Sequence, residues 1–478
     1  MEVIPLDDRI RRIDQFIFGK VKDSNLPSLG LAIVRDDDIV HRRGFGQRDL
    51  EAGLPATSET LYGIGSITKS FTCLAVMQLQ EAGKLHVTDP VDTYLDFDIK
   101  PSGEPVRIEH LMSHTSGIPA LAYAEAVIRK GFGDQAEGVP IGNVQDMLTF
   151  MRDSSDWTHA RPGERWFYLN EGFVLLGGII ERVSGKPYAE YVTDHILRPL
   201  GMNRSFFTRE AVEKDHDAGR PYVVDQEGNR HPQSYLFGSI TADGGLISNV
   251  EDMARYIQMY LAGGQGLVTR NSLDEMMKPR VNTPPLEVYH LDDSSQTLTT
   301  DLQGAQPTSQ YGYGLGISDF FGRRLVAHGG SVLIATGQMS FLPAEGWGVM
   351  LLANGSGYPL NELAQYALAV LIGEDPDRLA FRHGEVRLDP FQGVYETYQG
   401  TYRATVRRTG DFLQFGTSSR YFKQQVPLVP EEITPSGARF FTLRGGSRLP
   451  VEFVVKGDGT IELLFERYKL RRVSSLVE

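Results

Sequence analysis

The sequence has one cysteine, no long hydrophobic run and no recognisable export signal, and each absence narrows the class of protein. Cys73 is the only cysteine among 478 residues, so no disulfide can form within the chain. No run of about 18 uncharged apolar residues occurs, which argues against a transmembrane helix. The first residues, MEVIPLDDRIRRIDQFIF, lack the basic start, apolar run and cleavage site of a secretory signal. We therefore expect a cytoplasmic protein.

Basic residues are also in deficit. The chain has 48 Lys and Arg against 61 Asp and Glu, a formal net charge of −13. Nucleic acids and anionic membranes both attract basic surfaces, so we expect neither as a partner. The sequence contains no P-loop and no dinucleotide-binding fingerprint, and we expect no cofactor. With 41% hydrophobic and 23% charged residues the chain has a globular composition, and its length predicts two or three domains.

The spacing of apolar residues predicts a mixed first domain of the α+β class. We expect a helix near residues 7–23, a β-hairpin over residues 29–46, and a helix from Ser66 to Ala82 with Gly83 at its end. The remaining segments are a mostly helical region to about Tyr260, a long loop at Arg280–Gln310, a strand meander near residues 311–354 and a closing helix at Asn361–Ile372.

The character of the chain changes after the segment GEDPD, residues 373–377. Beyond it, apolar residues alternate around Gly-Asp turns, which predicts a small all-β unit. We place the first domain at residues 1–373, a linker at 374–380 and the second domain at 381–478. Residues 378–478 contain 16 basic and 11 acidic residues, or +5, which leaves −18 for the preceding part. Charges of opposite sign favour docking of the two parts within the chain or between subunits, although loosely tethered domains fit as well.

The strongest chemical signal is Gly65-Ser66-Ile67-Thr68-Lys69 at the start of a predicted helix. Residues three apart share one helical face, so the Lys69 amine can reach the Ser66 hydroxyl. A serine hydroxyl is a weak nucleophile until a base takes its proton, and desolvation favours the neutral, basic form of an amine. The same helix end offers the Ser66 backbone N–H to an oxyanion.

Two further motifs follow in order, Tyr168-Leu169-Asn170 and His328-Gly329-Gly330. The succession S-x-x-K, Y-x-N, H-x-G resembles the three signatures of the penicillin-recognising serine hydrolases. That superfamily includes class C β-lactamases, D-alanyl-D-alanine carboxypeptidases, D-aminopeptidases and esterases. The resemblance covers about residues 5–372, and its connecting segments are LMSHTSGIP (111–119), RPLGM (198–202), ADGGLISNVEDMARY (242–256) and YGYGLGI (311–317).

The resemblance implies a role for each catalytic motif residue. Ser66 would attack a carbonyl and form an acyl-enzyme, and Lys69 would take its proton directly or through Tyr168. Tyr168 would pass a proton to the leaving group and activate the deacylating water. His328 stands where many members carry the lysine of K-T-G, and it would bind a substrate carboxylate or Tyr168. The implied fold is a two-lobed domain, with an antiparallel sheet flanked by helices and a mostly helical lobe.

The same resemblance implies the substrate-binding groups. Asn170 would hold Lys69 and a substrate carbonyl, and Gly329 with Gly330 would let an extended substrate lie along their strand. The backbone N–H groups of Ser66 and Ser331 would form the oxyanion hole. Because the H-G-G form is more similar to D-aminopeptidases and esterases, it argues against efficient hydrolysis of β-lactams.

These motifs leave the substrate open. The first hypothesis is a peptidase or amidase acting on small peptides, including peptides with D-residues. A carboxylesterase and a weak β-lactamase are alternatives on the same fold, because pocket shape and not the motifs selects among them. A non-catalytic binding or sensor protein that acylates without turnover is an alternative of a different class.

Two other features have structural explanations. His110 and His114 are four residues apart with Glu109 beside them, but the order departs from H-E-x-x-H, and we expect no metal site. Cys73 follows Ser66 by two helical turns, where a buried packing thiol is expected.

The second domain carries a short resemblance of its own. The segments FQGVY (391–395) and YQGTY (398–402) resemble the first strands of lipocalin-like β-barrels that are appended to some members of the superfamily. A domain of this length suits eight short strands. Such a barrel could bind an apolar ligand, restrict the active-site mouth or mediate assembly. We favour assembly, so the predicted partners are a small-molecule or short-peptide substrate and further copies of the chain.

Overall fold

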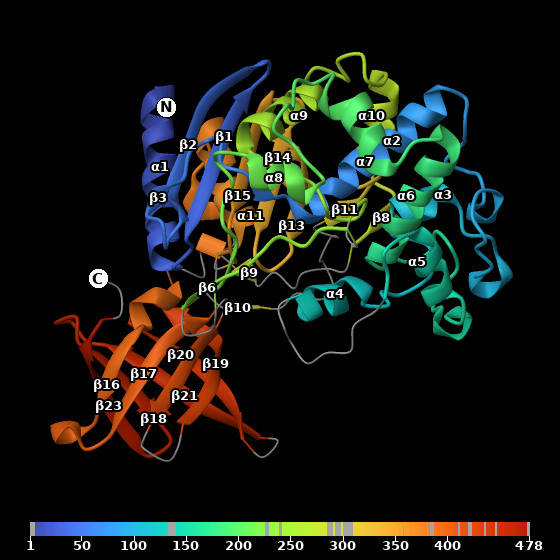
Figure 1. Ribbon diagram of the computed structural model, residues 1–478. Helices are drawn as coiled ribbons and strands as arrows, with labels where there is room; N and C mark the ends of the chain where they lie inside the picture. Colours follow the sequence, from blue (N-terminus) through green and yellow to red (C-terminus); the bar gives the residue numbers. More distant parts are fainter. Residues whose placement is uncertain are drawn as a thin grey trace. The chain divides into compact units, whose positions relative to one another are not determined.

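The computed structural model describes residues 5–131, 140–224, 229–238, 241–283, 290–291, 298–299, 309–356, 358–379, 381–382, 387–409, 412–418, 423–434, 436–444 and 447–475 (Figure 1). The chain forms two compact units, each with its own hydrophobic core. The first unit comprises Met1–Pro285 with Pro307–Glu374, and the second comprises Leu286–Gln306 with Asp375–Glu478. Among the described residues no helix is both long and apolar enough to cross a bilayer.

An antiparallel sheet forms the centre of the first unit. Its strand order is β3-β2-β1-β15-β14-β13-β12-β11-β8, so the amino-terminal hairpin, blue in Figure 1, pairs with the last strand of the orange meander. The strands are β1 (Ser28–Arg35), β2 (Asp38–Asp49), β3 (Leu54–Pro55), β8 (Val281–Asn282), β11 (Ser309–Tyr311), β12 (Gly316–Phe320), β13 (Arg323–Ser331), β14 (Thr336–Leu342) and β15 (Trp347–Ala353). The predicted hairpin and meander are both present.

Helices cover the central strands of this sheet. α1 (Leu6–Asp23) packs on α11 (Leu360–Ile372), which lies against β14 and β15, and α9 (Val250–Leu261) lies against β1 and β15. Every residue of β15 is buried, as expected for a strand covered on both faces, which reads as a continuous apolar run instead of an alternating one. The core of the sheet therefore lies in its middle strands.

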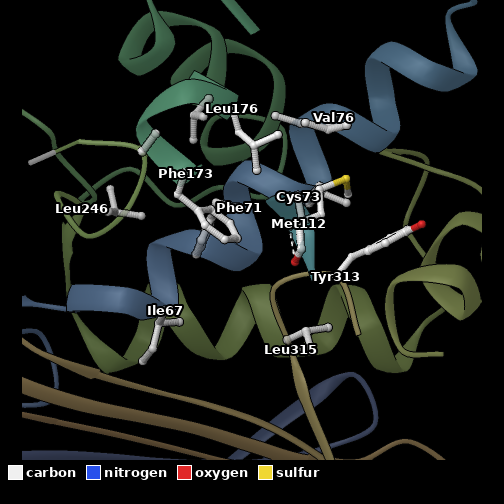
Figure 2. Close-up of a cluster of buried hydrophobic side chains, with 14 of the residues drawn as sticks. Ile67, Phe71, Cys73, Val76, Met112, Phe173, Leu176, Leu246, Tyr313 and Leu315 are labelled. Carbon is white, nitrogen blue, oxygen red and sulfur yellow. Dashed lines mark hydrogen bonds between the residues drawn. The ribbon is translucent and has the colours of Figure 1, made fainter. Parts of the chain in front are cut away.

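The second lobe of this unit is mostly helical and is centred on α2 (Thr68–Glu81). Phe71, Val76 and Cys73 of α2 pack among side chains from α3, α6 and the segment before β12 (Figure 2). The helix predicted from Ser66 begins as a 3₁₀ turn, Gly65–Ile67, and continues as α2, with Gly83 in the left-handed region just after its end. The other helices of this unit are α3 (Ile108–Met112), α4 (Tyr123–Gly131), α5 (Val144–Met151), α6 (Asn170–Ser184), α7 (Tyr188–Val192), α8 (Arg209–Lys214) and α10 (Arg270–Met276), and its small strands are β4 (Tyr62–Gly63), β5 (Tyr222–Val224), β6 (Arg230–Pro232) and β7 (Ile247–Ser248).

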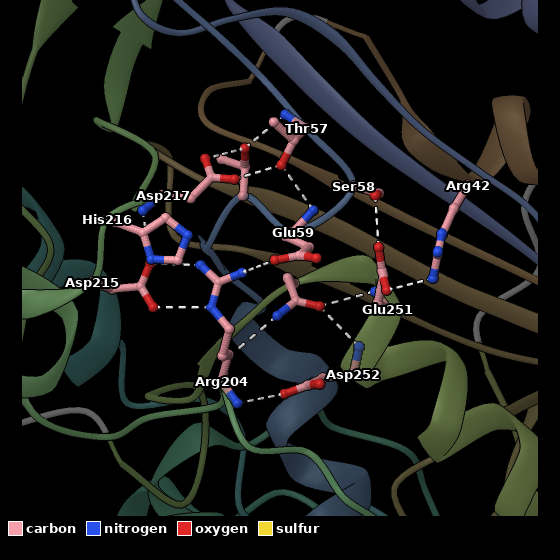
Figure 3. Close-up of polar contacts among 12 residues, drawn as sticks. Arg42, Thr57, Ser58, Glu59, Arg204, Asp215, His216, Asp217, Glu251 and Asp252 are labelled. Carbon is pink, nitrogen blue, oxygen red and sulfur yellow. Dashed lines mark hydrogen bonds and ion pairs between the residues drawn. The ribbon is translucent and has the colours of Figure 1, made fainter.

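A buried polar network links the start of α9 to the loops around it (Figure 3). Arg204 makes a bidentate contact with Asp215, at 2.5 and 3.0 Å, and its backbone N–H donates to Asp252 at 2.8 Å. Glu251 accepts from Arg42 and from Ser58, each at 2.7 Å. Because these carboxylates are largely shielded from water, each needs its partner, and the network holds several loops in register.

The second unit contains a closed antiparallel barrel in which each strand pairs with the next and the last pairs with the first. Its interior is filled by aromatic side chains, including Phe415 against Phe465 and Phe453 against Phe391, Tyr395 and Phe440. The eight predicted strands are present: β16 (Gly393–Glu396), β17 (Arg403–Thr409), β18 (Phe412–Ser418), β19 (Lys423–Thr434), β20 (Gly437–Arg444), β21 (Ser447–Val455), β22 (Ile461–Phe465) and β23 (Tyr468–Ser474). The predicted fold class is confirmed, and the described interior residues of the barrel form a hydrophobic core.

The predicted loop at 280–310 is only partly within the described residues. Its two ends form β8 and β11 of the large sheet, and short strands β9 (His290–Leu291) and β10 (Leu298–Thr299) pair with each other. The expected absence of regular structure is therefore wrong at these positions, because backbone pairing supplies structure where the side-chain pattern has no period. The other residues of this segment lie outside the described part.

Candidate active site

Ser66 and Lys69 lie side by side at the start of α2. The Lys69 Nζ atom is 3.0 Å from Ser66 Oγ and 2.5 Å from the backbone oxygen of Asp243. The Lys69 side chain has no exposed surface, whereas Ser66 is half-buried. The Lys69 Nζ atom also lies 4.9 Å from the centre of the Tyr168 ring. Lys69 thus contacts the Ser66 hydroxyl from the buried side, and of these two residues only Ser66 is exposed to solvent.

Strand β13 passes against this serine turn in backbone contact. A Cβ atom added to Gly65 would lie 2.8 Å from the Ser331 nitrogen, and φ of Gly65 is +54°. A Cβ atom added to Gly330 would overlap the oxygen of Ile64 and lie 3.1 Å from the Ser66 nitrogen. Only glycine fits at either position, and this close approach places the N–H groups of Ser66 and Ser331 in one neighbourhood.

Tyr168 and Asn170 stand at the beginning of α6, and His114 holds their segment. The Nδ1 atom of His114 accepts from the Leu169 N–H at 2.9 Å, and its ring lies 4.1 Å from the ring of Tyr168. Burial, with Lys69 nearby, holds the pKa of His114 well below its usual value. His114 is therefore a neutral positioning residue that orients Tyr168.

His328 is nearly buried, and both of its ring nitrogens have protein partners. Nδ1 lies 2.6 Å from the oxygen of Gly329, which can only accept, so Nδ1 carries the proton. Nε2 lies 2.8 Å from the Tyr311 hydroxyl, and Nε2 accepts from it. Burial, with Lys69 nearby, lowers the pKa of His328 to about 4. The imidazole is thus neutral near pH 7 and pairs with Tyr311, whereas the resemblance implied a substrate carboxylate or Tyr168 as its partner.

These groups line one cleft of about 570 Å³. The predicted residues that line it are Ser66, Tyr168, Asn170, His328, Gly329, Gly330 and Ser331, and Lys69 lies behind Ser66. Other walls come from α4, the segment around Asp243, β14 and the start of α11. The fold therefore brings together residues that are far apart in the sequence, from Ser66 to Asn361.

No cluster suited to a metal ion occurs among the described residues. His110 and His114 both use Nδ1 to accept a backbone N–H, from Arg107 and Leu169 respectively. Both histidines therefore fix the backbone of neighbouring segments, and neither Nδ1 atom is available to a metal ion.

A sequence model of the β-lactamase family matches residues 13–373, about three quarters of the chain. This chain belongs to the β-lactamase family. A second model, the Pab87 octamerisation domain, matches residues 376–471. The chain is similar over 97% of its length to the whole chain of the octameric penicillin-binding protein homologue from Pyrococcus abyssi, with 41% identity and a TM-score of 0.86.

Other similar proteins are more distant from this chain. Protein flp of Staphylococcus aureus (strain MW2) is 26% identical over 370 residues, which are 75% of this chain and 66% of that protein. The chain thus spans slightly less than two thirds of that relative. A D-stereospecific amidohydrolase from Streptomyces sp. has the same fold, with 22% identity, a TM-score of 0.58, and coverage of 76% of this chain and 99% of that one. The resemblance inferred from the motifs is confirmed at the level of the family.

Within this β-lactamase-family site, sequence patterns missed a buried acidic pair behind Lys69. Asp243 supplies its backbone oxygen to Lys69, and its carboxyl accepts from the Tyr123 hydroxyl. The Glu171 carboxyl accepts the N–H groups of Leu121 and Tyr123 at 3.1 and 3.2 Å. Burial raises the pKa of both carboxyl groups. The only sequence signal for this pair was the acidic residue Asp243 in the segment ADGG. Its distance along the chain from the S-x-x-K motif follows no rule, so the contact with Lys69 could not be predicted.

Proposed function

We propose that the chain is a serine hydrolase that works through an acyl-enzyme on Ser66. The observation that supports it is the 3.0 Å contact between Ser66 Oγ and the buried Lys69 amine at the floor of a cleft. A paired amine and hydroxyl at a helix start form an activated nucleophile.

In this proposal Ser66 Oγ bonds to the substrate carbonyl carbon while its proton passes to Lys69. The carbonyl electron pair moves to oxygen, where the N–H groups of Ser66 and Ser331 stabilise it. The bond to the leaving group then breaks as that group receives the proton through Tyr168. Water attacks the ester, giving up a proton along the same route, and Ser66 Oγ departs with a proton restored.

We infer amides of small peptides as substrates, including those with D-residues. Supporting this choice are the neutral His328, where the K-T-G lysine of related enzymes would stand, and the fold shared with a D-stereospecific amidohydrolase. Esters are easier to cleave, so esterase activity accompanies the proposal, and hydrolysis of β-lactams is expected to be slow.

The test is a substrate panel containing p-nitrophenyl acetate, D- and L-alanine p-nitroanilides and a chromogenic cephalosporin. We expect Ser66→Ala to lower kcat/KM at least ~10³-fold for every hydrolysed substrate, and Ser184→Ala, remote from the cleft, to match the wild type. Retained activity in Ser66→Ala would indicate another nucleophile. Labelling of Ser66 by a fluorophosphonate with no turnover of any substrate would support the sensor alternative.

We also propose that the barrel mediates self-association. The match of residues 376–471 to an octamerisation domain and the octameric relative support this role. Leu443 on β20 is 66% exposed, so its side chain is available for a contact between copies of the chain. Light scattering after size exclusion should give an oligomer for the full chain and a smaller mass for Leu443→Glu. A monomeric wild-type chain would contradict the proposal.

A further inference from the structure

The walls of the cleft carry acidic groups and no basic side chain among the described lining residues. Glu125 contributes an exposed carboxyl group, whereas the Asp243 carboxyl is buried and accepts from Tyr123. None of the described residues that line the cleft is a lysine or an arginine. Lys69 lies behind Ser66 with no exposed surface and is already paired with Ser66 and Asp243. The described lining residues thus offer a substrate no lysine or arginine other than the buried Lys69.

The His328 imidazole, which lines the cleft, does not supply a cation either. His328 Nδ1 donates to Gly329 and Nε2 accepts from Tyr311, and this pairing holds the neutral ring in place. Protonation would require Tyr311 to turn its hydroxyl hydrogen away from Nε2. A substrate carboxylate near β13 would consequently lose its hydration without gaining an ion pair, which is unfavourable.

Glu125, in contrast to His328 and Lys69, presents an exposed charged group at the cleft. It lies on α4 with Ala124 and Ile128, which line the same wall. Its charge acts on the buried Glu171 and Tyr123, so it lies near the acidic pair behind Lys69. A positively charged group entering the cleft meets a carboxylate within a concave wall, where attraction is stronger than on an open surface.

We propose that the cleft selects acyl compounds that carry a free ammonium group and rejects those with a carboxylate near the scissile bond, with Glu125 as the specificity-determining residue. This inference rests on the proposed hydrolase function and defines its substrate class. Free amino-terminal amides and peptides fit it, and acidic or succinylated ones do not.

Three chromogenic substrates test the inference, namely D-alanine p-nitroanilide and its N-acetyl and N-succinyl derivatives. At pH 7 and low salt the free amine, with a pKa near 8, is mostly protonated. We expect kcat/KM to fall in the order free amine, N-acetyl, N-succinyl. In Glu125→Gln the ratio of free amine to N-acetyl should fall about 3- to 10-fold, and 0.5 M salt should reduce the wild-type ratio.

Glu210→Gln, an exposed glutamate on α8, is the matched control and should keep the wild-type ratio. Equal or better hydrolysis of the succinyl substrate, or an unchanged ratio in Glu125→Gln, would overturn the inference. Ser66-dependent hydrolysis of p-nitrophenyl acetate in the same preparations separates the two proposals. If that activity is present without charge discrimination, only the inference fails, and if it is absent, both fail.

Discussion

Replacing Gly330 with alanine tests whether backbone contact between β13 and the serine turn sets the catalytic geometry. The added methyl group would overlap the oxygen of Ile64, so strand and turn must separate by about 1 Å. A displacement of that size at a reacting centre lowers rates by about 10²-fold, and overpacking of this kind costs about 1–3 kcal/mol of stability.

The neighbouring glycine provides a matched control. A Cβ atom at Gly329 would lie 3.1 Å from the side-chain oxygen of Gln338, so a shift of a few tenths of an ångström is enough to accommodate it. We expect Gly330→Ala to lower kcat at least ~10-fold more than Gly329→Ala does. The assay is kcat for p-nitrophenyl acetate, with urea unfolding to confirm that both variants are folded. A Gly330→Ala variant with wild-type kcat, or equal losses in both variants, would refute the argument.

Three further predictions concern buried groups. His114→Phe should lower the free energy of unfolding by about 1–3 kcal/mol, because the Leu169 N–H loses its acceptor, and it should also lower kcat. An unchanged midpoint of urea unfolding would contradict this prediction. Since the pKa of His328 is about 4, below the usual 6.5, the unfolded chain binds the extra proton between these values. The contribution of the neutral His328 to the free energy of unfolding is complete above pH 6.5 and is lost as the pH falls toward 4, by up to about 3 kcal/mol. Urea unfolding at a series of pH values should therefore give a shallower pH dependence for His328→Gln than for the wild type. Arg204→Ala should destabilise by about 2–3 kcal/mol because Asp215 is left buried without its partner, and a smaller loss for Arg204→Lys, measured by thermal unfolding, would support the ion pair as the cause.

Local spacing was sufficient to predict several parts of this molecule. The pitch of a helix brings residues three apart onto one face, so the contact of Ser66 with Lys69 follows from S-x-x-K alone. Short apolar runs bounded by turn residues predicted the amino-terminal hairpin and the meander, and alternating apolar residues predicted the barrel. A strand buried on both faces reads as a continuous apolar run, and a strand buried on one face reads as an alternating one. The ends of the 280–310 segment escaped prediction because two- and three-residue strands have too few side chains to show a period.

Contacts between distant segments required the tertiary structure. The partner of His328 could not be chosen from the sequence, since Tyr311 and Tyr168 are both near it in space and only packing decides which hydroxyl reaches Nε2. The roles of His114 as a support for Tyr168 and of Asp243 as a partner for Lys69 likewise depend on how loops meet.

The sequence by itself therefore determined the contact between Ser66 and Lys69 and the classes of the two domains, because these depend on helix pitch and on the pattern of apolar residues in strands. Only the tertiary structure decided the charge of the cleft. Burial neutralises His328, Lys69 turns inward, and Glu125 reaches the wall, and each of these depends on which side chains exclude water.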